Sequence, residues 1–197
     1  NKRDAAYFDL YVQPIGEEAK LVHKTGEGVH NVSFLAFSNN KNFILFTEER
    51  TNRYQFLKLL DINNDKVSKI SDDNLFGGFK YAFFNEQDDQ VTIITNQGKD
   101  FSGIANIDIS SKSLEYIYSE DHEVEYMKND NDNDRILFFI NDRGYSKLGI
   151  LNLVDGSAEI ISEPNEVTFM EPGWAWGLTI LDKLSTNDKS SKQNVFI

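Results

Sequence analysis

The stretch Arg135-Ile-Leu-Phe-Phe-Ile-Asn-Asp-Arg-Gly-Tyr-Ser-Lys-Leu-Gly-Ile-Leu-Asn-Leu-Val-Asp-Gly-Ser157, followed by Ala158-Glu-Ile-Ile-Ser162, decides the fold of this 197-residue chain. Its apolar runs are too short for globular helices. The polar sequences Asn-Asp-Arg-Gly and Asp-Gly separate these runs, and both are typical of tight turns. The stretch therefore predicts three consecutive antiparallel strands.

The same pattern recurs along the chain, where it predicts strands over residues 43–47, 79–84 and 114–118, among others, and a polar connection over residues 48–53. The predicted third strand of each unit can be aligned on Gln13, Asp61, Asp108 and Asn152, which are spaced 48, 47 and 44 residues apart. A repeat of four short strands every ~40 to 50 residues is typical of a propeller blade. An immunoglobulin-like sandwich also has short strands, but it does not predict the repeat. We therefore expect an all-β fold, a β-propeller of four-stranded antiparallel blades.

The repeat also predicts how the chain is divided. Residues 1–197 are expected to form a single propeller segment with about four blades' worth of sequence. Because the repeat starts near the end of one blade and stops within another, we expect a partial propeller and a longer natural protein, with four-bladed closure as the alternative. The approximate blades are 1–30 (partial), 31–73, 74–121, 122–165 and 166–197 (partial).

Composition excludes several function classes. The chain has 32 acidic and 20 basic residues and a net charge of -12, which argues against a nucleic-acid partner. The acidity predicts either a solvated surface or a chamber that attracts cationic ligands. The absence of cysteine excludes disulfides, thiolate zinc sites and cysteine nucleophiles. No apolar run approaches the ~18 residues of a membrane-spanning helix, so no membrane partner is expected.

Three parts of the sequence resemble a known family. Residues 139–157 resemble a blade of the propeller of prolyl-oligopeptidase-type serine peptidases, in particular the acylaminoacyl-peptidase branch, where an Asn-Glu-Asp-Gly turn precedes a Leu-Tyr-Asp-Leu-like strand. Residues 46–61 and 8–14 are similar to strands of other blades in that family. TolB-type propellers share this pattern. The Ser-Pro-Asp-Gly turn that both families usually place between the first two strands is replaced here by other polar turns.

The resemblance implies a function. In the peptidase family the propeller covers a C-terminal α/β-hydrolase domain and restricts access to short peptides, and the catalytic Ser-Asp-His residues belong to the hydrolase. No such domain lies within these 197 residues. We expect a non-catalytic cap whose partners are that hydrolase and short peptides, in a cytoplasmic acylaminoacyl-peptidase-like or dipeptidyl-peptidase-like protein. The alternative is a TolB-like module that binds a protein partner and is periplasmic or secreted, with a signal peptide before Asn1.

The residues themselves predict no catalytic site, metal site or cofactor. The nearest match to a Gly-x-Ser-x-Gly nucleophile elbow, around Ser146, has one residue too many, so we predict that Ser146 lies in a turn. His23, His30 and His122 lie in different units without metal-ligand or triad spacing, and we predict structural or surface roles for them.

Three further groups of residues have the composition of a binding site. Residues 130–134 alternate oxygen ligands as a calcium loop does, but Arg135 replaces the required glycine, so a hairpin turn is predicted. Dipeptidyl peptidases of the wider family bind substrate amines with paired glutamates, whereas the context of Glu48 and Glu49 predicts a solvated turn. Trp174 and Trp176 could line a ligand surface, although packing is the more common role of such aromatic residues in blades.

Overall fold

A computed structural model describes residues 7–51, 53–72, 74–130 and 134–161. In that part of the chain all regular secondary structure is β-strand, and no helix is long and apolar enough to cross a membrane. The strands are β1 (Leu10–Val12), β2 (Lys20–His23), β3 (Asn31–Phe37), β4 (Phe43–Thr51), β5 (Tyr54–Asp61), β6 (Lys66–Lys69), β7 (Phe79–Phe84), β8 (Gln90–Thr95), β9 (Gly103–Asp108), β10 (Leu114–Tyr118), β11 (Glu123–Asn129), β12 (Arg135–Asp142), β13 (Tyr145–Asn152) and β14 (Ala158–Ile160).

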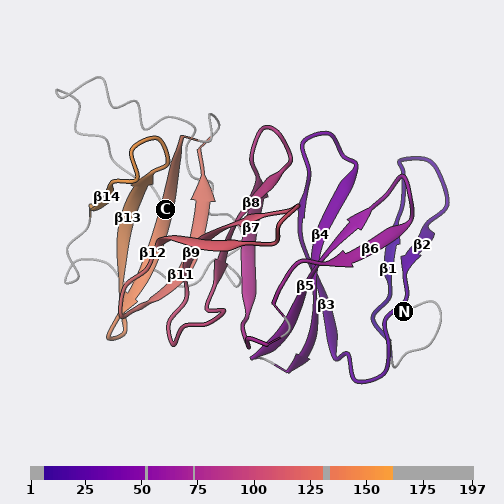
Figure 1. The fold of residues 1–197 in the computed structure, drawn as a ribbon, viewed down its shortest axis with the longest axis horizontal. Helices are drawn as coiled ribbons and strands as arrows, with labels where there is room; N and C mark the ends of the chain where they lie inside the picture. Colours follow the sequence, from indigo (N-terminus) through magenta and orange to yellow (C-terminus); the bar gives the residue numbers. More distant parts are fainter. Residues whose placement is uncertain (1–6, 52, 73, 131–133, 162–197) are drawn as a thin grey trace. The chain divides into compact units, whose positions relative to one another are not determined.

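The strands form one two-stranded and three four-stranded antiparallel sheets (Figure 1). In each four-stranded sheet the strands follow one another in chain order. The three sheets are β3 to β6, β7 to β10 and β11 to β14. This confirms the predicted four-stranded antiparallel blades. The chain divides into two compact units after Val124. The assignment of the whole chain to a single propeller segment stays a prediction.

Equivalent strands end at the positions that align the repeat. Asp61, Asp108 and Asn152 are the last residues of β5, β9 and β13, and Gln13 directly follows β1. The side chains of the first three accept hydrogen bonds from backbone N–H groups two or three residues further on, at 2.6 to 3.1 Å. Such Asx contacts close the turn locally. The repeat was therefore visible in the sequence because these turns depend on side chains at fixed positions.

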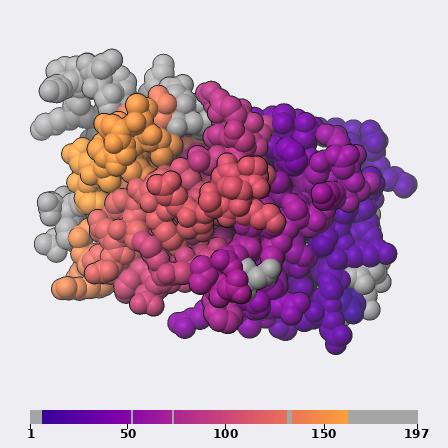
Figure 2. Space-filling model, in the orientation of Figure 1, coloured from indigo at the N-terminus to yellow at the C-terminus, as the bar shows by residue number. Residues whose placement is uncertain are grey.

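Core packing in the first unit lies between two sheets. One apolar cluster joins the sheet β3–β6 to the sheet β7–β10, and side chains on the other face of β3–β6 pack against β1 and β2. The segments of this unit, coloured from indigo through magenta to coral, adjoin one another in the space-filling view (Figure 2). The buried residues of the first cluster are Ala36, Leu45, Leu57, Leu59, Ile70, Phe79, Phe84, Val91, Ile93 and Ile107.

Strand β4 contributes buried side chains to both faces of the sheet β3–β6. Leu45 belongs to the cluster on one face, while Ile44 and Phe46 pack against β1 and β2 on the other. A strand buried on both faces is expected to be apolar throughout, and this one is until residue 46. It then continues to Thr51, four residues beyond the predicted end at Thr47. The polar connection predicted for residues 48–53 is therefore mostly strand.

The second unit contains the stretch that decided the fold. Strand β12 buries Ile136, Phe138 and Ile140 on one face, and β13 pairs with it in continuous register from Arg135 to Asp142. The connection between them is a two-residue turn with positive φ at Arg143 (55°) and Gly144 (91°). This is the geometry of the type I′ turn that favours twisted hairpins.

Candidate functional site

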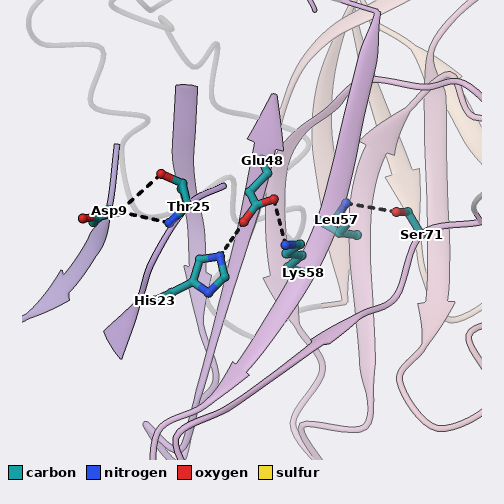
Figure 3. A network of polar contacts seen from close by, with 7 residues as sticks. All are labelled: Asp9, His23, Thr25, Glu48, Leu57, Lys58 and Ser71. Atoms are coloured by element: carbon teal, nitrogen blue, oxygen red, sulfur yellow. Dashed lines mark hydrogen bonds and ion pairs between the residues drawn. The ribbon is translucent and has the colours of Figure 1, made fainter. Parts of the chain in front are cut away.

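Glu48 is the centre of a buried polar network in the first unit (Figure 3). Its Oε1 atom contacts Nε2 of His23 on β2, and its Oε2 atom lies 2.7 Å from Nζ of Lys58 on β5. The His23 ring also packs against Phe46, with ring centroids 5.3 Å apart. The network thus links the β1–β2 pair to the neighbouring sheet.

The predicted solvated turn at Glu48 and Glu49 is wrong. Strand pairing continues through both residues, with Glu48 opposite Phe56 and Glu49 opposite Gln55 in β5. Only 6% of Glu48 is exposed, because β2 covers this face of the sheet. The Glu-Glu-Arg sequence predicted a solvated turn because charged residues are seldom buried without partners. The partners of Glu48 lie on other strands, His23 on β2 and Lys58 on β5.

The environment keeps Glu48 ionised. Burial raises the pKa of its carboxyl group, but hydrogen bonds from His23 and Lys58 and the positive charge of both partners lower it, and the net result is a pKa below the ordinary 4.5. Both carboxylate oxygens are already engaged. An incoming amine would have to displace an existing partner, so the arrangement serves to hold strands together.

Glu49 lies on the opposite face of the strand, because successive side chains in a strand point to opposite sides. Its Oε1 atom accepts a hydrogen bond of 2.9 Å from the Ser33 hydroxyl, which in turn accepts one of 3.1 Å from the amide of Asn31. The two adjacent glutamates therefore cannot converge on one ligand. The amine-binding role suggested by dipeptidyl peptidases has no geometric support here.

Two further polar contacts secure the loops around this network (Figure 3). The carboxylate of Asp9 accepts hydrogen bonds from the backbone N–H (3.0 Å) and hydroxyl (3.3 Å) of Thr25. The Ser71 hydroxyl accepts one of 3.1 Å from the backbone N–H of Leu57. Buried backbone donors that no neighbouring strand pairs need such acceptors. These contacts are structural.

The other sequence candidates are dispersed. His30 is exposed, and its backbone N–H donates a hydrogen bond to the carbonyl of Glu49. The backbone of His122 forms an isolated antiparallel β-bridge with that of Glu120. Asp130 accepts hydrogen bonds from the backbone of residues 134 and 135 and pairs with the Arg135 guanidinium at 3.0 Å. Among the described residues no group of three potential ligands is placed to hold a metal ion.

The prediction that Ser146 lies in a turn is wrong. The turn consists of Arg143 and Gly144 alone, so Ser146 is the second residue of β13 and is 5% exposed. Its place in a strand also differs from the strand-to-helix turn that an elbow serine needs. Trp174 and Trp176, with the predicted partial blade 166–197, lie outside the described residues.

One surface was not predicted from the sequence, and we call it the Phe56 surface. It consists of Arg50, Tyr54, Phe56, Lys69 and Phe76 in the first unit. Tyr54 contacts Phe56 and Phe76 edge to face, with ring centroids 4.8 and 5.0 Å apart. The Arg50 guanidinium carbon and the Lys69 ammonium lie over the Phe56 ring at 5.5 and 5.0 Å from its centroid.

Backbone pairing explains this surface. Gly77 forms a parallel bridge with Tyr54, and its carbonyl accepts a hydrogen bond of 3.2 Å from Gln55. An added Cβ at Gly77 would lie 2.9 Å from Gln97, so this approach requires glycine. The chain thereby places Phe76, which is 70% exposed, beside Tyr54. In the sequence, this surface is indicated only by the pair Leu75-Phe76 directly before Gly77 and Gly78.

Comparison with known proteins gives a fold and no family. No protein-family model matches the sequence, and no curated protein matches it. Solved structures do match, among them a prolyl endopeptidase with a TM-score of 0.65 and 12% identity over 81% of this chain. TolB from Acinetobacter baumannii has a TM-score of 0.60 and 16% identity, also over 81%. The fold is that of a partial β-propeller.

Other peptidases share the propeller. A puromycin-hydrolyzing peptidase from Mycobacterium tuberculosis matches 74% of this chain at a TM-score of 0.59 and 8% identity. This chain covers 39% of the Acinetobacter TolB, 24% of the prolyl endopeptidase and 23% of the mycobacterial peptidase. Identities this low establish the fold alone.

Proposed function

We propose that this chain is the non-catalytic propeller of a larger serine peptidase, in which it restricts access of short peptides to an α/β-hydrolase domain. The observation that carries the proposal is the similarity of 81% of the chain to a prolyl endopeptidase, together with the resemblance of residues 139–157 to a blade of that family. In this proposal the hydrolase and short peptides are the partners, and the protein is cytoplasmic.

The first strand of the sheet β3–β6 suits such a filter. First strands line the central channel of a propeller. On β3, Phe34 and Phe37 are 52% and 44% exposed, and their rings contact each other at 5.1 Å between centroids. Exposed aromatic side chains offer apolar contact to a peptide that passes along the strand. We propose that these two residues contact peptides on their way to the hydrolase.

The complete coding sequence tests the proposal. We expect it to encode a Gly-x-Ser-x-Gly elbow after residue 197, and the full-length protein to cleave short peptides but not a folded protein. A serine-directed reagent should abolish the cleavage. The 197-residue chain alone should hydrolyse neither peptide nor ester substrates. A coding sequence that continues without this elbow would refute the proposal.

A second candidate function is a protein-binding module of the TolB type, periplasmic or secreted. The Phe56 surface favours it, because aromatic residues and arginine are enriched where proteins bind one another. This candidate predicts an export signal before Asn1 and further blades after Ile197. Finding the signal together with the elbow would instead indicate an exported peptidase.

A further inference from the structure

The Phe56 surface combines exposed aromatic rings with positive charge on an acidic protein. Phe76 and its neighbour Leu75 are 70% and 43% exposed, and Arg50 is exposed as well. The chain as a whole carries a net charge of -12. On this acidic protein, Arg50 and Lys69 place two cationic groups over one aromatic ring of the surface.

Other charged side chains act on the Lys69 ammonium group. Burial lowers the pKa of the Lys69 ammonium, and the neighbouring charges of Lys112 and Lys58 lower it further, while Asp72 acts in the opposite direction. Lys58 is paired with Glu48, so those two charges offset each other. Arg50 is exposed, so its guanidinium group beside the Phe56 ring can meet a carboxylate of a partner.

We propose that the Phe56 surface binds a segment of a partner protein in which acidic and apolar side chains are combined. The inference concerns a binding surface of this chain and does not depend on the presence of a hydrolase domain.

The chemistry of the Phe56 surface favours a partner segment that combines acidic and apolar side chains. The rings of Tyr54 and Phe76 gain from contact with apolar or aromatic side chains, and edge-to-face contact already orders them. The guanidinium carbon of Arg50 lies 5.5 Å from the Phe56 ring centroid, and a guanidinium group has five N–H donors that can bind carboxylates. A nucleic acid would also offer planar rings and negative charge, but the acidity of the whole protein opposes a long phosphate backbone.

The test is selection of random 12-residue peptides displayed on phage against the 197-residue chain. Peptides that also bind the variant carrying Phe76→Ser and Arg50→Glu are removed in each round. We expect the selected peptides to combine Asp or Glu with Leu, Phe or Trp. The most enriched peptide is then synthesised with a fluorescent label, and its affinity is measured by anisotropy.

Single variants locate the binding. Phe76→Ser and Arg50→Glu should each weaken binding of the labelled peptide about tenfold or more, as expected for anchor residues. Two matched controls change an exposed aromatic residue and an exposed arginine elsewhere, Phe101→Ser and Arg143→Glu, and should leave the affinity unchanged. Circular dichroism verifies that each variant is folded. Raising salt from about 0.05 M to about 0.5 M should weaken binding, because exposed charges are screened.

Several outcomes would overturn the inference. These are selection of no peptide, selection of neutral or basic peptides, equal affinity of both surface variants and the wild type, or tighter binding of a labelled oligothymidine than of the selected peptide. If the surface variants lose the peptide while the control variants keep it, the docking surface is established whatever the coding sequence shows about a hydrolase.

Discussion

The substitution Glu48→Gln removes a negative charge from the buried network while keeping the size of the side chain. Only 7% of the Glu48 side chain is exposed, and its partners His23 and Lys58 are exposed by 15% and 19%. A carboxylate accepts from both partners, whereas an amide presents an oxygen to one and an NH2 donor to the other. One donor therefore loses its acceptor, and Lys58 loses its counter-charge.

The magnitude follows from the burial of this pair. Removing one partner of a buried ion pair costs roughly 3 to 5 kcal/mol, because the remaining charge stays poorly solvated. Lys58 is partly exposed, and its long side chain can move the ammonium group toward water. We therefore expect a loss of about 3 kcal/mol in the free energy of unfolding, at the lower end of that range.

Urea unfolding at pH 7, followed by circular dichroism, measures this loss. The matched control is Glu49→Gln on the adjacent residue, which is half-buried and accepts a hydrogen bond from the Ser33 hydroxyl. An amide oxygen can still accept that bond, so the control should lose about 1 kcal/mol or less. Equal losses in the two variants would show that Glu48 is not held in a buried ion pair.

Lowering the pH gives an independent test. Because the folded state lowers the pKa of Glu48 below 4.5, its ionised form stabilises the fold above that pH. The stabilisation is lost as the pH falls through the lower pKa of the folded state. The difference in stability between the wild type and Glu48→Gln should therefore shrink below pH 4.5, and a difference that persists undiminished well below that pH would contradict the reasoning.

Two other predictions use local geometry. In Gly149→Ala the new Cβ would lie 2.8 Å from Cε1 of the fully buried Phe138 ring, so the ring must move, at a cost of about 1 to 3 kcal/mol. Gly26→Ala enters open space, and equal urea midpoints for the two variants would exclude this clash. Hydrogen bonds from the backbone and hydroxyl of Ser111 lower the pKa of Asp108 to about 2. Ser111→Ala should raise this pKa in an NMR titration, and an unchanged value would show that the hydroxyl does not contribute.

The sequence predicted most of the fold because the relevant signals are local. Strands β7 and β10 have the predicted bounds, Phe79–Phe84 and Leu114–Tyr118, since each is flanked by polar turn residues. The predicted end of β4 at Thr47 was wrong because two consecutive glutamates weaken the apolar pattern. Ser146 was misplaced because the two-residue turn before it is shorter than its polar sequence suggests.

The sequence by itself determined that this protein is built from four-stranded antiparallel blades, because alternation along a strand and side-chain closure of turns act over a few residues. Only the tertiary structure decided that Glu48 is buried and that Phe76 stands beside Tyr54. Each of those facts depends on a segment about 20 residues or more away in sequence, namely β2 for Glu48 and the loop after β6 for Tyr54. Contacts between such distant segments are set by the packing of whole sheets, and a local sequence pattern does not predict that packing.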